Sequence, residues 1–292
     1  MCKSMVVKAP AKINLGLAVL KRRSDGYHDL LSIMQQVSLA DTLTIEPVRG
    51  AGLSFSCSDP SLNGEDNLVC RAAALLAAQT RKALPGVKID LYKNIPVEAG
   101  LGGGSSDAAA ALSALNRYWR LDLTAQTLGE LGSRLGSDIP FCLQGGTALA
   151  SGRGEVLQPL PGLSFFWVVL AVPAGLGLST ASVFRALNLE GAPRPPIRRL
   201  IAAVQRESRE EIVNWLEERH TNSLEAGVVA AYPRLMALKK RMRELGLVPV
   251  MSGSGPTFFA LTGGARLAGN AVRILRDEGY RAYLCWTERS TR

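Results

Sequence analysis

Residues 95–111 read Ile-Pro-Val-Glu-Ala-Gly-Leu-Gly-Gly-Gly-Ser-Ser-Asp-Ala-Ala-Ala-Ala and place a glycine-rich loop directly before a predicted helix. The four glycines within residues 100–104 let the backbone approach a ligand without clashes from a Cβ atom. The helix start that follows offers unpaired N–H groups and the positive end of the helix dipole, and both bind phosphate oxygens. The stretch therefore predicts an anion-binding loop.

Two common phosphate-binding motifs do not describe this loop. No lysine follows the glycines, as a P-loop requires, and Ser105 stands where a dinucleotide-binding motif has its last glycine. A plain alternative is a turn capped by Ser105, Ser106 or Asp107 before an ordinary alanine-rich helix. A cap needs one serine and a turn needs one or two glycines, so the density of both favours a binding loop.

Composition indicates a folded protein with a large core. The chain has 292 residues, of which 47% are hydrophobic and 20% charged, and this length predicts two domains. The longest apolar stretch, residues 165–178, is too short to span a bilayer and contains Pro173 and Gly175. Lysines interrupt the N-terminal residues, so we expect no secretion signal, no membrane contact and a cytoplasmic location. The five cysteines and two histidines are too scattered to predict disulfides or a zinc site.

The net charge of +9 permits two kinds of partner, nucleic acid or small polyanionic substrates. The densest basic run, at 239, 240, 241 and 243, falls in a predicted helix, where a solvated face explains it. Basic and aromatic residues do not alternate as in a nucleic-acid groove. No nucleic-acid partner is therefore expected, and a basic RNA-binding protein, with steeply salt-dependent oligonucleotide binding, is kept as an alternative of a different class.

Periodicity predicts an α+β chain. Apolar residues alternate from Ile13 to Val19, which places Lys12 and Asn14 on one face of a strand. Further strands are expected at 30–37, 42–48, 53–57, 87–92, 165–172 and 281–286, the earlier ones in an antiparallel sheet, and a glycine-containing pair of strands is expected at 145–157. Helices are expected at 67–81, from the glycine loop to 119, and at 124–136, 180–187, 197–206, 210–219, 233–245 and 269–278. Prolines and a glycine near 160 predict domains 1–160 and 161–292.

Four further islands accompany the glycine loop. They are Pro-Ala-Lys-Ile-Asn-Leu at 10–15, Asp-Gly-Tyr-His at 25–28, Gly-Ser-Asp-Ile-Pro-Phe at 136–141 and Met-Ser-Gly-Ser-Gly-Pro at 251–256. Together, in this order, the five segments resemble the GHMP small-molecule kinases, and most closely those that act on a cytidylyl methylerythritol. The resemblance covers nearly the whole chain. The loop is similar to the general signature, whereas the first two islands are similar to the specific kinases.

The resemblance implies a two-domain fold, with an N-terminal ribosomal-protein-like α/β sandwich and a C-terminal ferredoxin-like α+β domain. It also implies transfer of the ATP γ-phosphate to the 2-hydroxyl of the cytidylyl methylerythritol, with Mg²⁺ as cofactor. A hydroxyl of Ser105 or Ser106 is expected to assist the metal, whose other ligands stay open, as does the oligomeric state. The implied ATP site comprises Pro96, Val97, Glu98, Ala99, Gly100, Leu101, Gly102, Gly103, Gly104, Ser105, Ser106 and Asn67.

Phosphoryl transfer to an alcohol needs a proton acceptor and a positive charge near the transferred group. Asp138 matches the first role in the resembled family, and Lys12 matches the second. Taken alone, Asp138 is an ordinary turn carboxylate and Lys12 a solvent-facing strand lysine. The joint pattern favours the catalytic interpretation for both residues.

Substrate choice is expected from the first two islands. By the resemblance, the Tyr27 ring stacks on cytosine, the His28 imidazole binds its polar edge, and Asn14 joins them from the Lys12 face. The plain alternative is a hairpin tyrosine packed on the core beside a surface histidine. Another GHMP kinase, acting on mevalonate, homoserine or a sugar, would share the loop without needing this pair, while a degenerate nucleotide sensor fits poorly with both Lys12 and Asp138 present.

Three further sequence expectations concern small residues and a cap. Gly253 and Gly255 are expected to let a hairpin approach the glycine loop or the substrate, although two glycines in a turn need no function. Gly16, beside Lys12, is expected to leave space for a ligand. Asn67 fits a helix cap as well as it fits the adenosine side of ATP.

Overall fold

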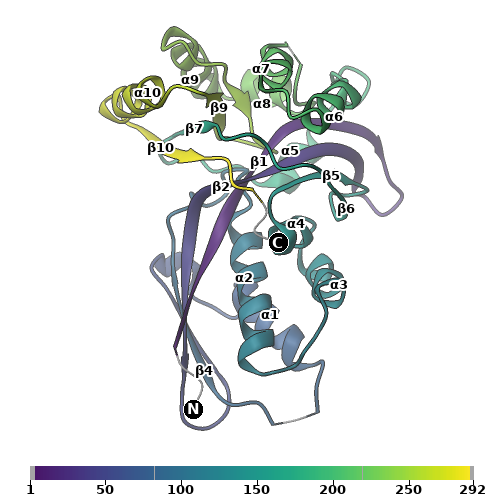
Figure 1. Ribbon diagram of the computed structural model, residues 1–292, viewed down its shortest axis with the longest axis vertical. Helices are drawn as coiled ribbons and strands as arrows, with labels where there is room; N and C mark the ends of the chain where they lie inside the picture. The colour runs from purple at the N-terminus through teal and green to yellow at the C-terminus, as the bar shows by residue number, and fades with distance from the viewer. Residues whose placement is uncertain (1–3, 82, 219, 290–292) are drawn as a thin grey trace. The chain divides into compact units, whose positions relative to one another are not determined.

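The computed structural model describes residues 4–81, 83–218 and 220–289 (Figure 1). The chain forms two compact units, neither of which is one continuous stretch. The first comprises Met1–Ala11, Ala40–Pro96 and Gly102–Gln144, and the second Lys12–Leu39, Val97–Leu101 and Gly145–Arg292. The consecutive domains 1–160 and 161–292 stay a prediction, which this grouping does not test.

Two long strands contribute residues to both units. They are β1 (Met5–Arg22) and β2 (His28–Pro47), which pair with each other. The sequence predicts β2 as two strands, at 30–37 and 42–48, because Ser38 and Asp41 interrupt its apolar pattern. Asp41 is nevertheless fully buried, so the strand continues through a polar position.

In the first unit β2 pairs antiparallel with β4 (Val87–Tyr92), with Thr42 opposite Tyr92. The third strand, β3 (Leu53–Cys57), pairs with β4 in parallel, so the predicted antiparallel sheet is wrong at this pair. The reason lies in the connection, because η1 (Pro60–Leu62) and α1 (Leu68–Ala77) intervene, and parallel neighbours need such a crossover.

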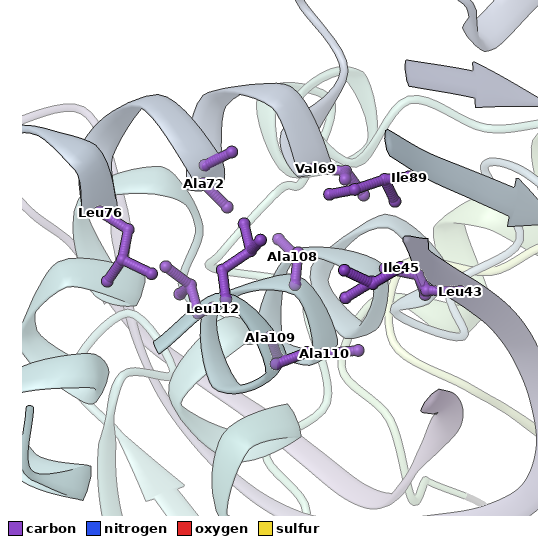
Figure 2. Close-up of a cluster of buried hydrophobic side chains, with 14 of the residues drawn as sticks. Leu43, Ile45, Val69, Ala72, Leu76, Ile89, Ala108, Ala109, Ala110 and Leu112 are labelled. Carbon is purple, nitrogen blue, oxygen red and sulfur yellow. The ribbon is translucent and has the colours of Figure 1, made fainter. Parts of the chain in front are cut away.

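Four α-helices complete the first unit: α1, α2 (Gly103–Tyr118), α3 (Ala125–Leu135) and α4 (Ile139–Gln144). Figure 2 shows Ala72 and Leu76 of α1 facing Ala108 and Leu112 of α2. The small alanine side chains let two helix backbones pack closely, and all four of these residues are fully buried. The alanine-rich sequence after the glycine loop therefore fixes α2 in the core of this unit.

The second unit contains a hairpin of β5 (Thr147–Ser151) and β6 (Val156–Pro159), and β5 also pairs with β2. A separate antiparallel sheet has the order β10-β7-β9-β8. Its strands are β7 (Trp167–Pro173), β8 (Val250–Met251), β9 (Phe258–Thr262) and β10 (Tyr280–Trp286). The helices are α5 (Thr180–Arg185), α6 (Ile197–Gln205), α7 (Arg209–Glu217), α8 (Glu225–Ala231), α9 (Pro233–Glu244) and α10 (Ala265–Asp277). Figure 1 shows α9 and α10 along one face of the sheet, where they share its core.

Most predicted elements are confirmed, and the failures have local causes. Asn67 and Thr124 cap α1 and α3 as expected. The helix predicted at 124–136 is followed by a further helix that the sequence analysis does not predict, because Ile139 begins α4 although a proline follows it. Pro140 lies in the first turn of α4, where a missing N–H removes no hydrogen bond. The sequence gives no signal for α8, and the predicted end of a helix at residue 219 lies outside the described residues. No helix in the described part of the chain combines the length and apolar character that a bilayer-spanning segment needs.

Candidate active site

The glycine loop contacts a turn far away in the sequence. Gly100 has a φ of +73°, and a Cβ atom there would lie 2.3 Å from the carbonyl oxygen of Ser252 and 2.9 Å from the amide nitrogen of Gly255. The Ser252 hydroxyl donates a hydrogen bond to the carbonyl oxygen of Gly100 at 3.0 Å. The predicted approach of the hairpin around Gly253 and Gly255 to the loop is therefore confirmed, and only glycine fits at position 100.

We expect Gly100→Ala to lower the free energy of unfolding by about 3 kcal/mol, through the left-handed φ and the clash with backbone atoms. Because the clash displaces the loop, the affinity for ATP should fall as well. Chemical denaturation and equilibrium ATP binding measure the two effects. Gly269→Ala is the matched control, since a Cβ in this part of α10 meets nothing within 4 Å. It should leave the ATP affinity unchanged and raise the free energy of unfolding by up to about 1 kcal/mol, because alanine favours a helix interior. Equal behaviour of the two variants would contradict the tight fit at Gly100.

The helix that follows the loop starts without a side-chain cap. Its N-cap is Gly102, with a φ of +69°, and no side chain of the described residues accepts a hydrogen bond there. Ser105, Ser106 and Asp107 lie inside the helix, so the plain alternative in which one of them caps it is wrong. The N–H groups of the first turn are left for an anion.

The two serines of the motif have different surroundings. Ser106 is 2% exposed, and its hydroxyl donates a hydrogen bond to the carbonyl oxygen of Pro10 at 2.7 Å. Ser105 is only partly buried, and a Cβ atom on Gly136 would lie 3.6 Å from its hydroxyl oxygen. Ser105 is therefore the better placed of the two to bind a ligand.

The described residues contain no group of three or more His, Cys, Asp or Glu side chains that could hold a metal ion. This fits Mg²⁺ in a nucleotide site, where one or two protein oxygens act together with phosphate oxygens and water. The Ser105 hydroxyl is a hard oxygen donor of the required kind.

Lys12 is not the solvent-facing lysine of the plain alternative. Its side chain is 5% exposed, and its ammonium donates a hydrogen bond to Asn14 Oδ1 at 2.7 Å. This contact confirms that Lys12 and Asn14 share one face of β1. Asn14 Nδ2 donates in turn to the Ser32 hydroxyl at 2.8 Å, which fixes the amide.

The turn that contacts the loop also contacts this pair. A Cβ atom on Gly253 would lie 3.1 Å from Asn14 Oδ1 and 3.3 Å from Lys12 Nζ. The backbone N–H of Lys12 donates to the carbonyl oxygen of Leu101 at 2.9 Å. The second unit therefore brings together a buried ammonium, the 97–101 part of the loop and the 252–255 turn.

Asn222 and Glu225 support this turn, and the sequence analysis misses both. Asn222 Nδ2 donates hydrogen bonds to the carbonyl oxygens of Met251 and Gly253, each at 2.8 Å. Glu225 Oε2 accepts from the N–H of Met251 at 2.9 Å, and Lys239 pairs with the same carboxylate. No motif marks the two residues, because their partners in the turn lie more than 20 positions away.

Asp138 is partly buried and precedes α4 in the first unit, and its carbonyl oxygen accepts the N–H of Cys142 at 3.0 Å. Lys12 belongs to the second unit. The joint action of Lys12 and Asp138 therefore stays a prediction.

Tyr27 and His28 lie at the tip of the hairpin between β1 and β2. Tyr27 is 54% exposed, and the guanidinium carbon of Arg153 lies 4.9 Å from the centre of its ring. His28 is buried, and its ring lies 5.3 Å from that of Phe184, tilted by 34°. The plain alternative of a core tyrosine and a surface histidine is wrong for both. Arg153 and Phe184 come from distant segments, so no local pattern predicts them.

Burial, together with the positive charge of Arg22, lowers the pKa of the His28 imidazole below its usual value. The imidazole is therefore neutral at pH 7, so one ring nitrogen can donate a hydrogen bond to a ligand and the other can accept one.

The remaining predicted site residues differ in their burial. Pro96, Ala99 and Leu101 are buried, whereas Val97, Glu98 and Gly104 are exposed. Asn67 uses its side chain within the protein, where Oδ1 accepts from the N–H of Val69 at 2.9 Å and Nδ2 donates to Leu62 at 3.0 Å. Its contact with ATP stays a prediction.

The expected ligand space beside Gly16 is absent. A Cβ atom there would lie 2.6 Å from the Trp215 ring and 2.9 Å from Ile197. Side chains of α6 and α7 fill the space, so Gly16 serves packing.

An uncapped helix after a glycine loop, with a buried lysine beside that loop, is the arrangement of a nucleotide-dependent phosphotransferase. Sequence profiles agree, since the GHMP kinases N terminal domain matches residues 67–146 and the GHMP kinases C terminal domain matches residues 200–281. Both domains of a GHMP kinase are thus present, and the predicted two-domain α+β fold of this class is confirmed.

Comparison with individual relatives identifies one family within the GHMP kinases. The 4-diphosphocytidyl-2-C-methyl-D-erythritol kinase of Exiguobacterium sibiricum is 46% identical over 261 residues, which cover 89% of each chain. The enzyme of that name from Bacillus subtilis is 42% identical over 87% of this chain and 86% of its own. A crystal structure of 4-(cytidine 5'-diphospho)-2C-methyl-D-erythritol kinase superposes with a TM-score of 0.81 at 42% identity, covering 97% of this chain and 99% of the other. The chain belongs to the GHMP kinases and, within them, to the 4-diphosphocytidyl-2-C-methyl-D-erythritol kinase family.

A homoserine kinase from Cytophaga hutchinsonii shares the fold, with a TM-score of 0.77 at 18% identity over 100% of this chain and 96% of its own. At that identity the likeness concerns the fold alone.

Proposed function

We propose that the chain phosphorylates the 2-hydroxyl of 4-diphosphocytidyl-2-C-methyl-D-erythritol with ATP, giving the 2-phosphate and ADP, in isopentenyl diphosphate biosynthesis by the methylerythritol phosphate pathway. The observation that carries the proposal is buried Lys12, whose backbone N–H donates to Leu101 of the glycine loop and whose ammonium lies beside Gly253 of the supporting turn. The chain that holds this lysine is 46% identical to a 4-diphosphocytidyl-2-C-methyl-D-erythritol kinase. Both substrates are polyanions, so the net charge of +9 favours their association with the protein.

Residues of this chain are assigned to each step of the phosphoryl transfer. The loop N–H groups and the start of α2 bind the triphosphate, and the Lys12 ammonium offsets the charge on the transferred phosphoryl group. The Asp138 carboxylate accepts the proton of the attacking hydroxyl as the oxygen–phosphorus bond forms and ADP leaves. Mg²⁺ bound with ATP supplies further charge neutralisation, and the Ser105 hydroxyl is the ligand that this chain offers.

The cytosine base binds at the hairpin tip. Tyr27 presents an exposed ring, and Arg153 stacks on that ring. The neutral His28 imidazole, held against Phe184, hydrogen-bonds the polar edge of the base. A cytoplasmic location is part of the same proposal, because the substrates are soluble metabolites.

Tyr27→Ala should raise the KM for the cytidylyl substrate by roughly 10- to 100-fold, because base stacking on an aromatic ring contributes about 1–3 kcal/mol. The KM for ATP should stay unchanged, since cytosine is the only part of the two substrates that the ring is proposed to contact. Steady-state kinetics with each substrate varied in turn give both constants. Tyr27→Phe keeps the stacking surface and is the matched control, and an unchanged KM in Tyr27→Ala would defeat the stacking role.

Phosphorus NMR of the enzyme with ATP and Mg²⁺ tests the proposed function directly. Parallel samples contain the cytidylyl methylerythritol, mevalonate or homoserine. Stoichiometric ADP and a new phosphomonoester with the first alcohol alone are the expected result. Transfer only to another alcohol would keep the class and overturn the substrate, and transfer to none of the three would overturn the proposal.

A further inference from the structure

A buried lysine lies between two buried carboxylates in the first unit. The Lys93 side chain is 8% exposed, and those of Asp41 and Asp107 are 0% and 4% exposed. Lys93 Nζ forms an ion pair with Asp107 Oδ2 at 2.6 Å and a second, short one with Asp41 Oδ2. These three residues are called the Lys93 cluster below.

The cluster joins the chain that enters the glycine loop to the helix that leaves it. Asp41 Oδ1 accepts the backbone N–H groups of Asn94 at 2.5 Å and Ile95 at 2.8 Å, just before the loop. Asp107 lies in α2, just after the loop. One ammonium, bound to both carboxylates, therefore sets the separation of the two loop ends.

The two ends also touch directly. A Cβ atom on Gly103, the first residue of α2, would lie 3.1 Å from the Ile95 side chain and 3.4 Å from Lys93 Nζ. The ammonium is thus close to the helix start, where a positive charge favours a bound phosphate.

Burying the charges of the cluster costs folding free energy that an apolar contact between the same two elements would not cost. Two carboxylates share one ammonium, and Asp107 Oδ1 has no hydrogen-bond partner among the described residues. Burial raises the pKa of the Asp107 carboxyl to about 7. Well-packed apolar side chains often hold two elements together at least as stably as buried ions do. The placement of the charges beside the loop points to a role in binding.

We propose that Lys93 is a positioning residue for ATP: through Asp41 and Asp107 it holds both ends of the glycine loop in the conformation that binds the triphosphate. The inference deepens the proposed function and rests on it. The ion pairs of the cluster join the two ends of the glycine loop, whereas the alcohol substrate is proposed to bind Tyr27 and His28. Loss of the cluster should therefore weaken the binding of ATP and leave the binding of the alcohol substrate unchanged.

Lys93→Met tests the inference in the full chain. We expect the Kd for ATP, measured by calorimetry, to rise at least about tenfold, with the KM for the cytidylyl substrate changed less than about threefold. A general loss of structure would change both. Lys88→Met is the matched control, since Lys88 is 42% exposed and pairs at 2.6 Å with Asp90, a residue of β4 that lies at neither end of the glycine loop. Its Kd for ATP should equal that of the wild type.

Lys93→Met leaves two buried carboxylates without a cation, so a second variant covers the case in which it fails to fold. The double variant Lys93→Met with Asp107→Asn removes the excess charge, and Asp41 keeps its two backbone donors. It should show the same rise in Kd.

The outcomes separate the inference from the proposed function. If the wild type binds and uses ATP but the double variant binds it as tightly, the function stands and the inference is overturned. If the wild type does not bind ATP, the proposed function and the inference are both overturned. If neither variant folds, the cluster serves stability alone, and the inference is overturned.

Discussion

An Asp138→Asn variant is expected to fold normally and to lose turnover by a factor of about 10² to 10⁴, the usual contribution of a general base. The amide keeps the size of the side chain but cannot accept the proton of the attacking hydroxyl. Because Asp138 lies before α4 and outside the glycine loop, the KM for ATP should change little. Initial rates of ADP release, with both substrates varied, measure the two constants.

Asp122→Asn is the control for this variant. Asp122 is an exposed residue of the first unit with a φ of 53°, a conformation that asparagine also adopts. The control should retain wild-type turnover and unfolding temperature. Near-native turnover in Asp138→Asn would remove the residue as the base and would favour transfer without a protein proton acceptor.

Lys12→Met should lower kcat by a factor of about 10² to 10³, the loss typical when a group that stabilises transition-state charge is removed. Methionine keeps an unbranched side chain in this buried position, so the fold should survive although Asn14 Oδ1 loses its donor. Lys8→Met is the matched control, because Lys8 lies on the same strand but binds Thr42 at an exposed position, at 2.9 Å. Rapid-quench measurement of a single turnover reports the chemical step, and wild-type rates in Lys12→Met would contradict the electrostatic role.

Combining the two substitutions tests whether Lys12 and Asp138 act as a unit. Residues that act on one proton and one phosphoryl group show non-additive effects. The double variant should then lose little more activity than the more damaged single variant. Losses that multiply would mean that the two residues act independently, and would contradict their joint role in the transfer.

Local patterns predicted much of the fold. Side-chain caps at Asn67 and Thr124 depend on two or three neighbouring residues, and the structure confirms both helices. The parallel pairing of β3 with β4 depends instead on the crossover between them, so the predicted antiparallel sheet fails there. The start of α4 at Ile139 runs against the usual effect of a following proline, and only the folded chain shows Pro140 at the tolerated first turn.

The sequence by itself indicated the kinase class, through the resemblance of its five segments to the GHMP kinases. It also determined the glycine loop and the shared strand face of Lys12 and Asn14, because spacing along the chain defines both. Only the tertiary structure decided which side chains surround them. It buried Ser106 against Pro10 and left Ser105 only partly buried. It also placed Arg153 on Tyr27, and Lys93 between Asp41 and Asp107. These contacts join residues at least 14 positions apart, and their geometry follows from the packing of whole strands and helices.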